Sequence, residues 1–509
     1  MKFNQLKAGA MLSYASMFLT NTIAIFYTPF MLRHLGQAEY GIYALMGSLV
    51  GFLGILELGF GNTVVRYIAE YRAQNDRIKE SNLVAICLRI YGVIGLICLI
   101  IGGFIYLNLG KIFSDGLTGT EIDTAKIIFL LLILNLALSF PFNVFSSIIS
   151  GYERFVLRNT ITIARSIVLP CIMIPLLLLG YKAISIVVVQ TILNIVAALI
   201  NIGYVILVLK VKVKLHYLDR SFVKELLNYS SYVFLGAIVN QIYWNTDQTI
   251  LGIVANSAAI SVYAIGNQMV GFYMALSASI STMFLPRATK MVVNNANNDE
   301  LTGFFVRIAR LQFIVLGLFL SGFYLYGREF ITLWAGTQYA DSWLIAIILM
   351  ASNTIPLVQQ VGVSILQAKN KHRFRSIMYL FMAVANVFVS FPLAKLYGGI
   401  GSAIGTALAL VIGNIMIINL YYHFKLKLNI LHFFRQLLNR LLPSMLVSLL
   451  LGLLLRMIPI DSWLGLIVKC VSFIFVYGVI LWAGGINDSE KNLIFGSILN
   501  RKRVVQKTV

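Results

Sequence analysis

Long apolar runs alternate with short polar segments along almost the whole chain of 509 residues. A helix crosses the roughly 30 Å hydrocarbon core of a membrane with about 20 residues, at 1.5 Å per residue. Fourteen runs approach or exceed that length, over approximately residues 10–32, 41–62, 83–107, 126–148, 159–179, 184–209, 229–254, 259–285, 308–327, 343–366, 376–396, 400–422, 441–458 and 463–483. The pattern predicts an all-α polytopic membrane protein with about 14 transmembrane helices.

The composition supports a membrane protein. Apolar residues make up 59% of the chain, charged residues make up 12%, and the mean hydropathy is +0.86. A soluble domain carries about 25% charged residues, so this chain cannot cover a water-facing surface with charge. The apolar run that follows Lys2 and Lys7 continues to Phe30, longer than the core of a signal peptide. We therefore expect an uncleaved first helix.

The basic residues are distributed unevenly over the predicted connectors. Of the 40 Lys and Arg residues, 30 fall in segments on the N-terminal side of the membrane and 6 in the opposite connectors. Because short positively charged segments stay in the cytoplasm, this bias predicts that both termini are cytoplasmic. The net charge of +21 then belongs to loops that contact anionic lipid headgroups, and nucleic acid is not an expected partner.

Two stretches 220 residues apart have similar sequences. Residues 41–52 read GIYALMGSLVGF and residues 261–272 read SVYAIGNQMVGF, with five identities in twelve positions. Each stretch begins a predicted helix, the second and the eighth, so both helices run in the same direction. A parallel repeat predicts two six-helix lobes, over 1–214 and 215–424, followed by two helices and a basic tail over 425–509. Such duplication favours a transporter with its substrate site between the lobes.

Several connectors carry motifs that together resemble one family. They are RHLGQAEYGIYAL (33–45), LELGFGNTVVRYIAEY (56–71), GYERF (151–155), FITLWAGTQYADS (330–342) and YGGIGSAIGTA (397–407). In this order they resemble the Wzx-type flippases, in the polysaccharide transporter branch of the multidrug/oligosaccharidyl-lipid/polysaccharide (MOP) exporter superfamily. The resemblance covers the first twelve predicted helices, and the last two fit by number only.

The resemblance implies both an architecture and a cargo. The fold would be two six-helix bundles around a central cavity, working by alternating access. The cargo would be an undecaprenyl-diphosphate-linked oligosaccharide, moved from the inner to the outer leaflet of a bacterial cytoplasmic membrane during cell-surface polysaccharide biosynthesis. Membrane lipids would surround the protein, and polymerase or chain-length proteins of the same pathway are expected partners.

Three arginines are candidates for binding the diphosphate. Arg89 and Arg165 lie about six or seven residues inside the third and fifth predicted helices, and Arg66 lies at the inner end of the second. Charged side chains inside spans are costly and usually face a cavity. The alternative is snorkelling, in which the long side chain reaches the headgroups from the lipid side.

Other polar residues inside the predicted helices are candidates for lining that cavity. Glu57 lies in the second helix, and Asp247 lies in the unusually polar stretch NQIYWNTDQTIL (240–251). Asp247 could bind a coupling H⁺ or Na⁺, pair with an arginine, bind sugar hydroxyls, or form an interhelical contact. The amides that complete the candidate set are Asn21, Asn245, Gln248, Asn267 and Gln268, although single amides often only bridge helices.

No enzyme signature accompanies these residues. The five histidines lie in predicted loops or at helix ends without metal-ligand spacing, the four cysteines lie inside predicted helices, and no nucleotide-binding loop is present. We expect a protein that is not an enzyme and that holds no metal or cofactor besides a coupling ion. A membrane enzyme of the same pathway (glycan polymerase or ligase) and a drug or metabolite antiporter of the same superfamily are the alternatives.

Overall fold

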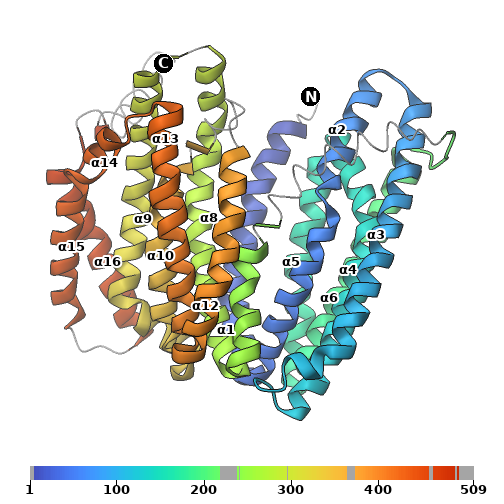
Figure 1. The fold of residues 1–509 in the computed structure, drawn as a ribbon, viewed down its shortest axis with the longest axis horizontal. Coiled ribbons are helices and arrows are strands. Elements are labelled where there is room, and N and C mark those ends of the chain that lie inside the picture. Colours follow the sequence, from blue (N-terminus) through green and yellow to red (C-terminus); the bar gives the residue numbers. More distant parts are fainter. Residues whose placement is uncertain are drawn as a thin grey trace, which may run out of the picture. The chain divides into compact units, whose positions relative to one another are not determined.

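The computed structural model describes residues 5–217, 238–239, 241–294, 296–360, 362–363, 373–457, 462–487 and 490–491. Every regular element in these ranges is helical (Figure 1). The α-helices are α1 (Gln5–Leu53), α2 (Phe60–Ala73), α3 (Arg77–Ile112), α4 (Gly119–Gly151), α5 (Phe155–Leu178), α6 (Ala183–Gly203), α8 (Ser257–Val293), α9 (Asn298–Trp334), α10 (Ser342–Val358), α12 (Arg373–Leu410), α13 (Ile418–Leu426), α14 (Ile430–Leu438), α15 (Leu441–Arg456) and α16 (Trp463–Ile480). Short 3-10 turns cover Gly54–Glu57 and Thr337–Tyr339, and π-helical turns cover Tyr204–Val208, Val411–Ile417 and Leu481–Gly485. A further helical stretch covers 241–254.

Eleven helical segments of the described chain are long and apolar enough to cross a membrane. Two of them, Met11–Ala73 and Ile377–Leu426, have 63 and 50 residues, more than twice what one crossing needs. Each contains a glycine in the left-handed region, Gly36 with φ 75° and Gly398 with φ 56°, where the helix direction breaks. These breaks confirm the turns predicted after the first and eleventh apolar runs. The total of 14 crossings stays a prediction, because the seventh run is described only in part.

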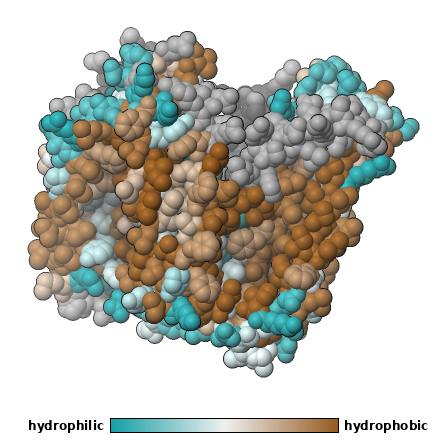
Figure 2. Space-filling model, in the orientation of Figure 1, coloured by the Kyte–Doolittle hydropathy of each residue, from teal (hydrophilic) through white to brown (hydrophobic). Residues whose placement is uncertain are grey.

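The outward faces of the helices are apolar. On α3 the exposed side chains Val93, Leu96, Ile100, Phe104 and Leu107 follow one another at helical spacing, and Leu107 is 78% exposed. Figure 2 shows apolar surface along the lengths of the helices and hydrophilic residues at their ends. A water-soluble protein does not expose continuous apolar stripes of this length, whereas a lipid bilayer covers them. The protein is therefore an all-helical, multi-pass membrane protein.

The chain forms two compact units. The first contains residues 1–264 and 379–406, and the second contains residues 265–378 and 407–509. Each unit combines chain segments that are distant in sequence. The predicted division into lobes over 1–214 and 215–424, with a terminal segment over 425–509, stays a prediction.

Close helix crossings organise the first unit. Helix α3 packs on α4, α4 packs on α6, and α1 packs on α5. Helices α3, α4 and α6 stand side by side in Figure 1. The second half of α1 packs closely on the stretch 241–257. A Cβ built at Gly41 would lie only 1.9 Å from the Ser257 carbonyl oxygen. At Gly252 a Cβ would lie 2.7 Å from the Leu45 side chain. Glycine is required at such crossings because any side chain would separate the backbones.

Two buried ion pairs organise the second unit. Arg310 on α9 donates to Glu490 at 2.6 Å and to the carbonyl oxygens of Gln436 and Gly485. Lys469 on α16 donates to Glu329 on α9 at 3.0 Å. Both basic side chains are 3% exposed, and breaking a buried pair leaves an uncompensated charge. These contacts tie the C-terminal helices to α9.

Candidate functional site

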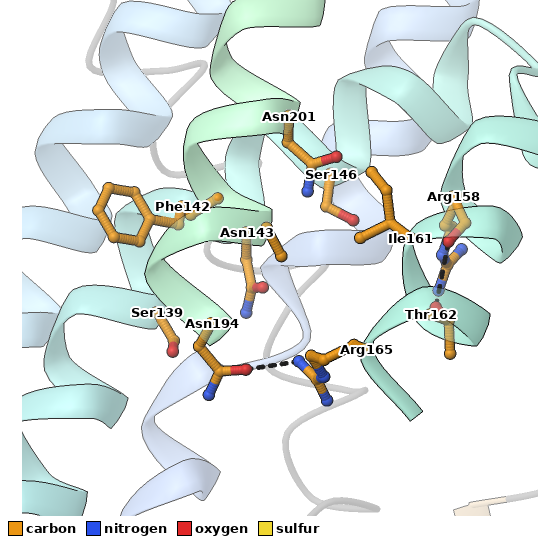
Figure 3. A pocket seen from close by; sticks show the side chains of 12 residues that line it. Ser139, Phe142, Asn143, Ser146, Arg158, Ile161, Thr162, Arg165, Asn194 and Asn201 are labelled. Atoms are coloured by element: carbon orange, nitrogen blue, oxygen red, sulfur yellow. Dashed lines mark hydrogen bonds between the residues drawn. The ribbon is translucent and has the colours of Figure 1, made fainter. Parts of the chain in front are cut away.

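A polar pocket lies between α4, α5 and α6 in the first unit (Figure 3). Its volume is about 340 Å³, within the usual range of ligand pockets. Each helix contributes side chains spaced by three, four and seven residues, which places them on one helix face. The lining residues are Ser139, Phe142, Asn143 and Ser146 of α4, Arg158, Ile161, Thr162 and Arg165 of α5, and Asn194, Ala197, Ala198 and Asn201 of α6.

Hydrogen bonds hold the two arginines of the pocket in place. Arg165 Nη1 donates to Asn194 Oδ1 at 2.5 Å, and Asn194 in turn donates to Asn135 Oδ1 at 3.1 Å. Two helical turns nearer the start of α5, Arg158 Nη1 donates to Ser150 Oγ at 3.2 Å. Both guanidinium groups are exposed, and each has five N–H donors, so donors remain for a ligand. In Figure 3 the arginines and the Asn143 and Asn194 amides surround a common space.

The charge of the pocket determines which ligands it accepts. Its lining contains two arginines and no Asp or Glu. A guanidinium group binds phosphate or carboxylate through two parallel hydrogen bonds, and asparagine amides both donate to and accept from hydroxyl groups. The pocket can therefore bind an anionic, hydroxyl-rich group, and it repels cations. In the part of the chain that the structure describes, no three His, Cys, Asp or Glu side chains come together to hold a metal ion.

Of the three predicted arginines, only Arg165 lines this pocket. Arg89 lies in a separate apolar groove between α3 and the start of α2. Arg66 on α2 is exposed, with its guanidinium carbon 5.6 Å from the centre of the Tyr67 ring. The structure does not bring Arg89 and Arg165 together. Arg158 lies on the same face of α5 as Arg165 and shares the pocket with it. Ligand binding by Arg89 and Arg66 stays a prediction.

Asp247 is buried and fully engaged in this structure. It is 1% exposed and accepts hydrogen bonds from Ser402 at 2.7 Å, from Thr406 at 2.6 Å, and from the Tyr263 hydroxyl. Asn386 donates to Thr406 at 3.1 Å and extends the network. Instead of lining a water-filled space, Asp247 forms the interhelical contact that the sequence left as an alternative, since hydroxyls of α8 and α12 close around it.

The remaining predicted residues are scattered. Asn245 donates to Gln241 and lies against Gly51, where a Cβ would be 2.8 Å from its amide nitrogen. Glu57 lies in the 3-10 turn after α1, beside Gly61. The amide side chains of Asn21, Gln248, Asn267 and Gln268 are all partly buried, the first two in the first unit and the last two on α8 in the second. Asn240, in the same polar stretch as Asp247, lies outside the described residues.

Sequence reasoning missed most of the pocket. Asn143, Asn194 and Asn201 are amides inside predicted spans, the same signal that drew attention to the stretch around Asp247. Their spacing from Ser139 and from one another at three, four and seven residues would have placed them on single helix faces. That three such faces meet became visible only in the fold.

Comparisons with known proteins agree with this architecture. The model of the family described as "Polysaccharide biosynthesis protein" matches residues 6–292. A Shigella flexneri protein named "Putative O-antigen transporter" is 24% identical over 415 residues, covering 78% of this chain and 93% of that protein. A Haloferax volcanii protein named "Probable low-salt glycan biosynthesis flippase Agl15" is 20% identical over 193 residues, covering 38% of this chain and 41% of that protein.

Solved structures show the same fold. The lipid II flippase MurJ in an inward closed conformation aligns with a TM-score of 0.71 at 16% identity, covering 96% of this chain and 99% of that one. An inward-facing multidrug resistance transporter of the MATE family, in the MOP superfamily, aligns with a TM-score of 0.63 at 15% identity, covering 79% and 93%. The fold is thus shared with these two solved structures, and since the family model matches more than half of the chain, the protein belongs to the polysaccharide biosynthesis protein family.

Proposed function

We propose that the protein is a polysaccharide flippase, which moves undecaprenyl-diphosphate-linked oligosaccharide units from the inner to the outer leaflet by alternating access. The observation that carries this proposal is the pocket of α4, α5 and α6, with its two arginines, its amides and its lack of acidic side chains. The names of the relatives, an O-antigen transporter and glycan or lipid II flippases, support a cargo of this class.

The pocket offers the contacts that such a cargo loses on leaving the headgroup region. A diphosphate is expensive to move through an apolar path unless positive charge replaces its water. Arg158 and Arg165 are seven residues apart, which is roughly 10 Å along α5. We assign the diphosphate to these arginines and the sugar hydroxyls to Asn143, Asn194 and Asn201.

The charge of the pocket also separates this proposal from its rivals. A drug antiporter that exports cations needs acidic side chains in its binding site, and none lines this pocket.

A glycan polymerase or ligase needs an outer loop with catalytic residues. The connector between α3 and α4, predicted to be outside, spans six residues, 113–118. Its one acid, Asp115, accepts a hydrogen bond from the neighbouring Ser114.

The test is translocation of a fluorescently labelled lipid-linked oligosaccharide by the full-length protein in proteoliposomes. Losing one charge-assisted hydrogen bond costs about 1.5–3 kcal/mol, so Arg165→Gln should weaken substrate binding roughly ten- to a hundred-fold. Arg165→Lys should be impaired less, because it keeps the charge and loses the fork geometry. The matched control is Arg154→Gln, which removes an exposed arginine at the start of α5 outside the pocket.

One result would refute the assignment of the pocket. A stably expressed Arg158→Ala/Arg165→Ala double variant that translocates the labelled lipid at the wild-type rate cannot use these arginines to bind it. Membership of the family would stand after that result, because it rests on the sequence match over residues 6–292.

We assign the coupling role, if transport is driven by H⁺ or Na⁺, to Asp247. One buried carboxylate with hydroxyl neighbours on α8 and α12 can exchange a proton or a sodium ion for hydrogen bonds as those helices move. Asp247→Asn keeps the size and shape of the side chain, removes the charge, and replaces one acceptor oxygen with an NH2 donor. We expect it to abolish the dependence of transport on an imposed pH or sodium gradient while binding of the labelled lipid persists. Unchanged gradient dependence would exclude Asp247 as the coupling group.

A further inference from the structure

Arg89 is a positive charge on the outward face of a membrane helix. It is exposed on α3 and shares that face with Val93, Leu96 and Ile100, which are also exposed. Within the described part of the chain, no hydrogen bond or ion pair satisfies its guanidinium. A charge in this position is costly unless an anion meets it, and the lipid side offers phosphate groups.

A groove next to Arg89 results from a break in the neighbouring helix. Between α1 and α2 the chain passes through Leu58 and Gly59, both left-handed, with φ of 55° and 70°. The break separates the axes of the two helices and leaves a groove of about 340 Å³ against α3. Its lining is Leu58, Phe60, Arg89, Ile90, Val93 and Ile94, and apart from the arginine it is entirely apolar.

We propose that this groove is a binding site for an anionic phospholipid of the inner leaflet, with one acyl chain along the groove and the phosphate on Arg89. Arg89 lies six residues, about 9 Å along the helix axis, inside the apolar run that begins at residue 83. With the N-terminus inside, as the charge distribution predicts, it lies where a long side chain reaches the headgroups of that leaflet.

The chemistry of the groove distinguishes this ligand from the others considered. Free phosphate gains nothing from five apolar side chains, so it does not explain the groove. The glycan of a transported lipid would need amides or hydroxyls, and the groove has none. A phospholipid matches both parts of the site, the single charge and the apolar channel beside it. The proposal does not depend on the proposed function, since a lipid can occupy this groove whatever the protein transports.

The experiment measures lipid retention by the purified full-length protein. The protein is extracted from membranes containing phosphatidylglycerol and phosphatidylcholine, and the lipids that stay bound are counted by native mass spectrometry. Arg89→Gln should reduce retained phosphatidylglycerol about ten-fold, the loss of one charge-assisted hydrogen bond. Val93→Trp, which fills the groove without changing charge, should reduce it similarly.

Matched controls exist for both variants. Leu96 lies one turn from Val93 on the same face, outside the groove, and the two are 58% and 59% exposed. Leu96→Trp should therefore retain lipid like the wild type, as should Arg154→Gln. Thermal unfolding of each variant in the same detergent separates lost binding from misfolding.

Two outcomes would overturn the proposal. If Arg89→Gln folds normally and retains phosphatidylglycerol at the wild-type level, the arginine does not hold the headgroup. If the wild type retains phosphatidylcholine as well as phosphatidylglycerol, the groove is ordinary lipid contact and no anionic site exists.

Discussion

At Gly41 two backbones meet without any side chain between them. A Cβ there would lie 1.9 Å from the carbonyl oxygen of Ser257, a distance that no packed structure tolerates. Gly41→Ala must push α1 away from the start of α8, and overpacking of this kind costs about 1–3 kcal/mol. We expect a lower midpoint of thermal unfolding in detergent.

Gly47, six residues later on the same helix, is the control for this prediction. Nothing lies within 4 Å of a Cβ built there. Gly47→Ala should leave the unfolding midpoint unchanged or raise it slightly, because alanine favours helix by about 1 kcal/mol. If the two variants have the same midpoint of thermal unfolding, the close approach at Gly41 does not limit stability.

At the residue scale the sequence revealed charges better than it revealed sites. Arg165 and Arg89 stood out because an arginine in an apolar run is rare, and one sequence cannot tell which helix face turns to lipid. The fold separates them: Arg165 meets Asn194 across a pocket, and Arg89 lies among exposed apolar side chains. Asp247 looked like a cavity residue because its neighbours along the chain are polar, yet its partners Ser402 and Thr406 come from a segment about 155 residues away.

The segment that follows the sixth helix is tethered to the start of α3. Asn82 Oδ1 accepts from the backbone nitrogens of His216 and Tyr217 at 2.9 and 3.2 Å. The neighbouring Glu80 accepts from the Tyr152 hydroxyl at 2.5 Å. Burial, with the hydrogen bond to Glu80, raises the pKa of Tyr152 to about 12, so the hydroxyl remains protonated and keeps donating at physiological pH. The same short stretch of α3 therefore anchors two connectors.

Asn82→Ala should release this tether. It removes two hydrogen bonds of about 1 kcal/mol each from a segment that carries lysines at 210, 212 and 214. Limited proteolysis with trypsin under native conditions should then cut after these lysines about thirty-fold faster, because local opening becomes more frequent. Asn108→Ala is the control, since that amide donates to the Phe104 carbonyl of its own helix. Equal cleavage rates in the two variants would contradict the tether.

At the element scale hydropathy was a sufficient guide to helices and an insufficient guide to their interruptions. The turns near Gly36 and Gly398 were predicted because each lies between two apolar runs that are both long enough for one crossing. The interruption at Leu58–Gly59 was not, because the residues around it are apolar and the crossing length is already satisfied. That break shapes the groove beside Arg89, so a site can depend on a feature that no apolar pattern records.

At the scale of the whole molecule, one prediction from the charge bias is still to be tested, the direction in which the chain crosses the membrane. Basic connectors predict that the N-terminus and the even-numbered turns are cytoplasmic. Connector residues suited to a test include the N-cap residues of α4 and α9, Thr118 and Asn297. A chemical label that cannot cross the bilayer shows on which side of the membrane each connector lies.

Single cysteines introduced into a cysteine-free variant test this direction in intact cells. The variant is made by replacing the four native cysteines, whose side chains lie in helices. Cysteines at positions 37, 118 and 338 should react with an impermeant maleimide from outside, and cysteines at positions 75, 297 and 427 should react only after the membrane is permeabilised. Reaction of Cys at 118 only after permeabilisation, with Cys at 75 labelled in intact cells, would reverse α3. It would also put Arg89 near the outer leaflet, so that the phospholipid it meets would come from that leaflet instead.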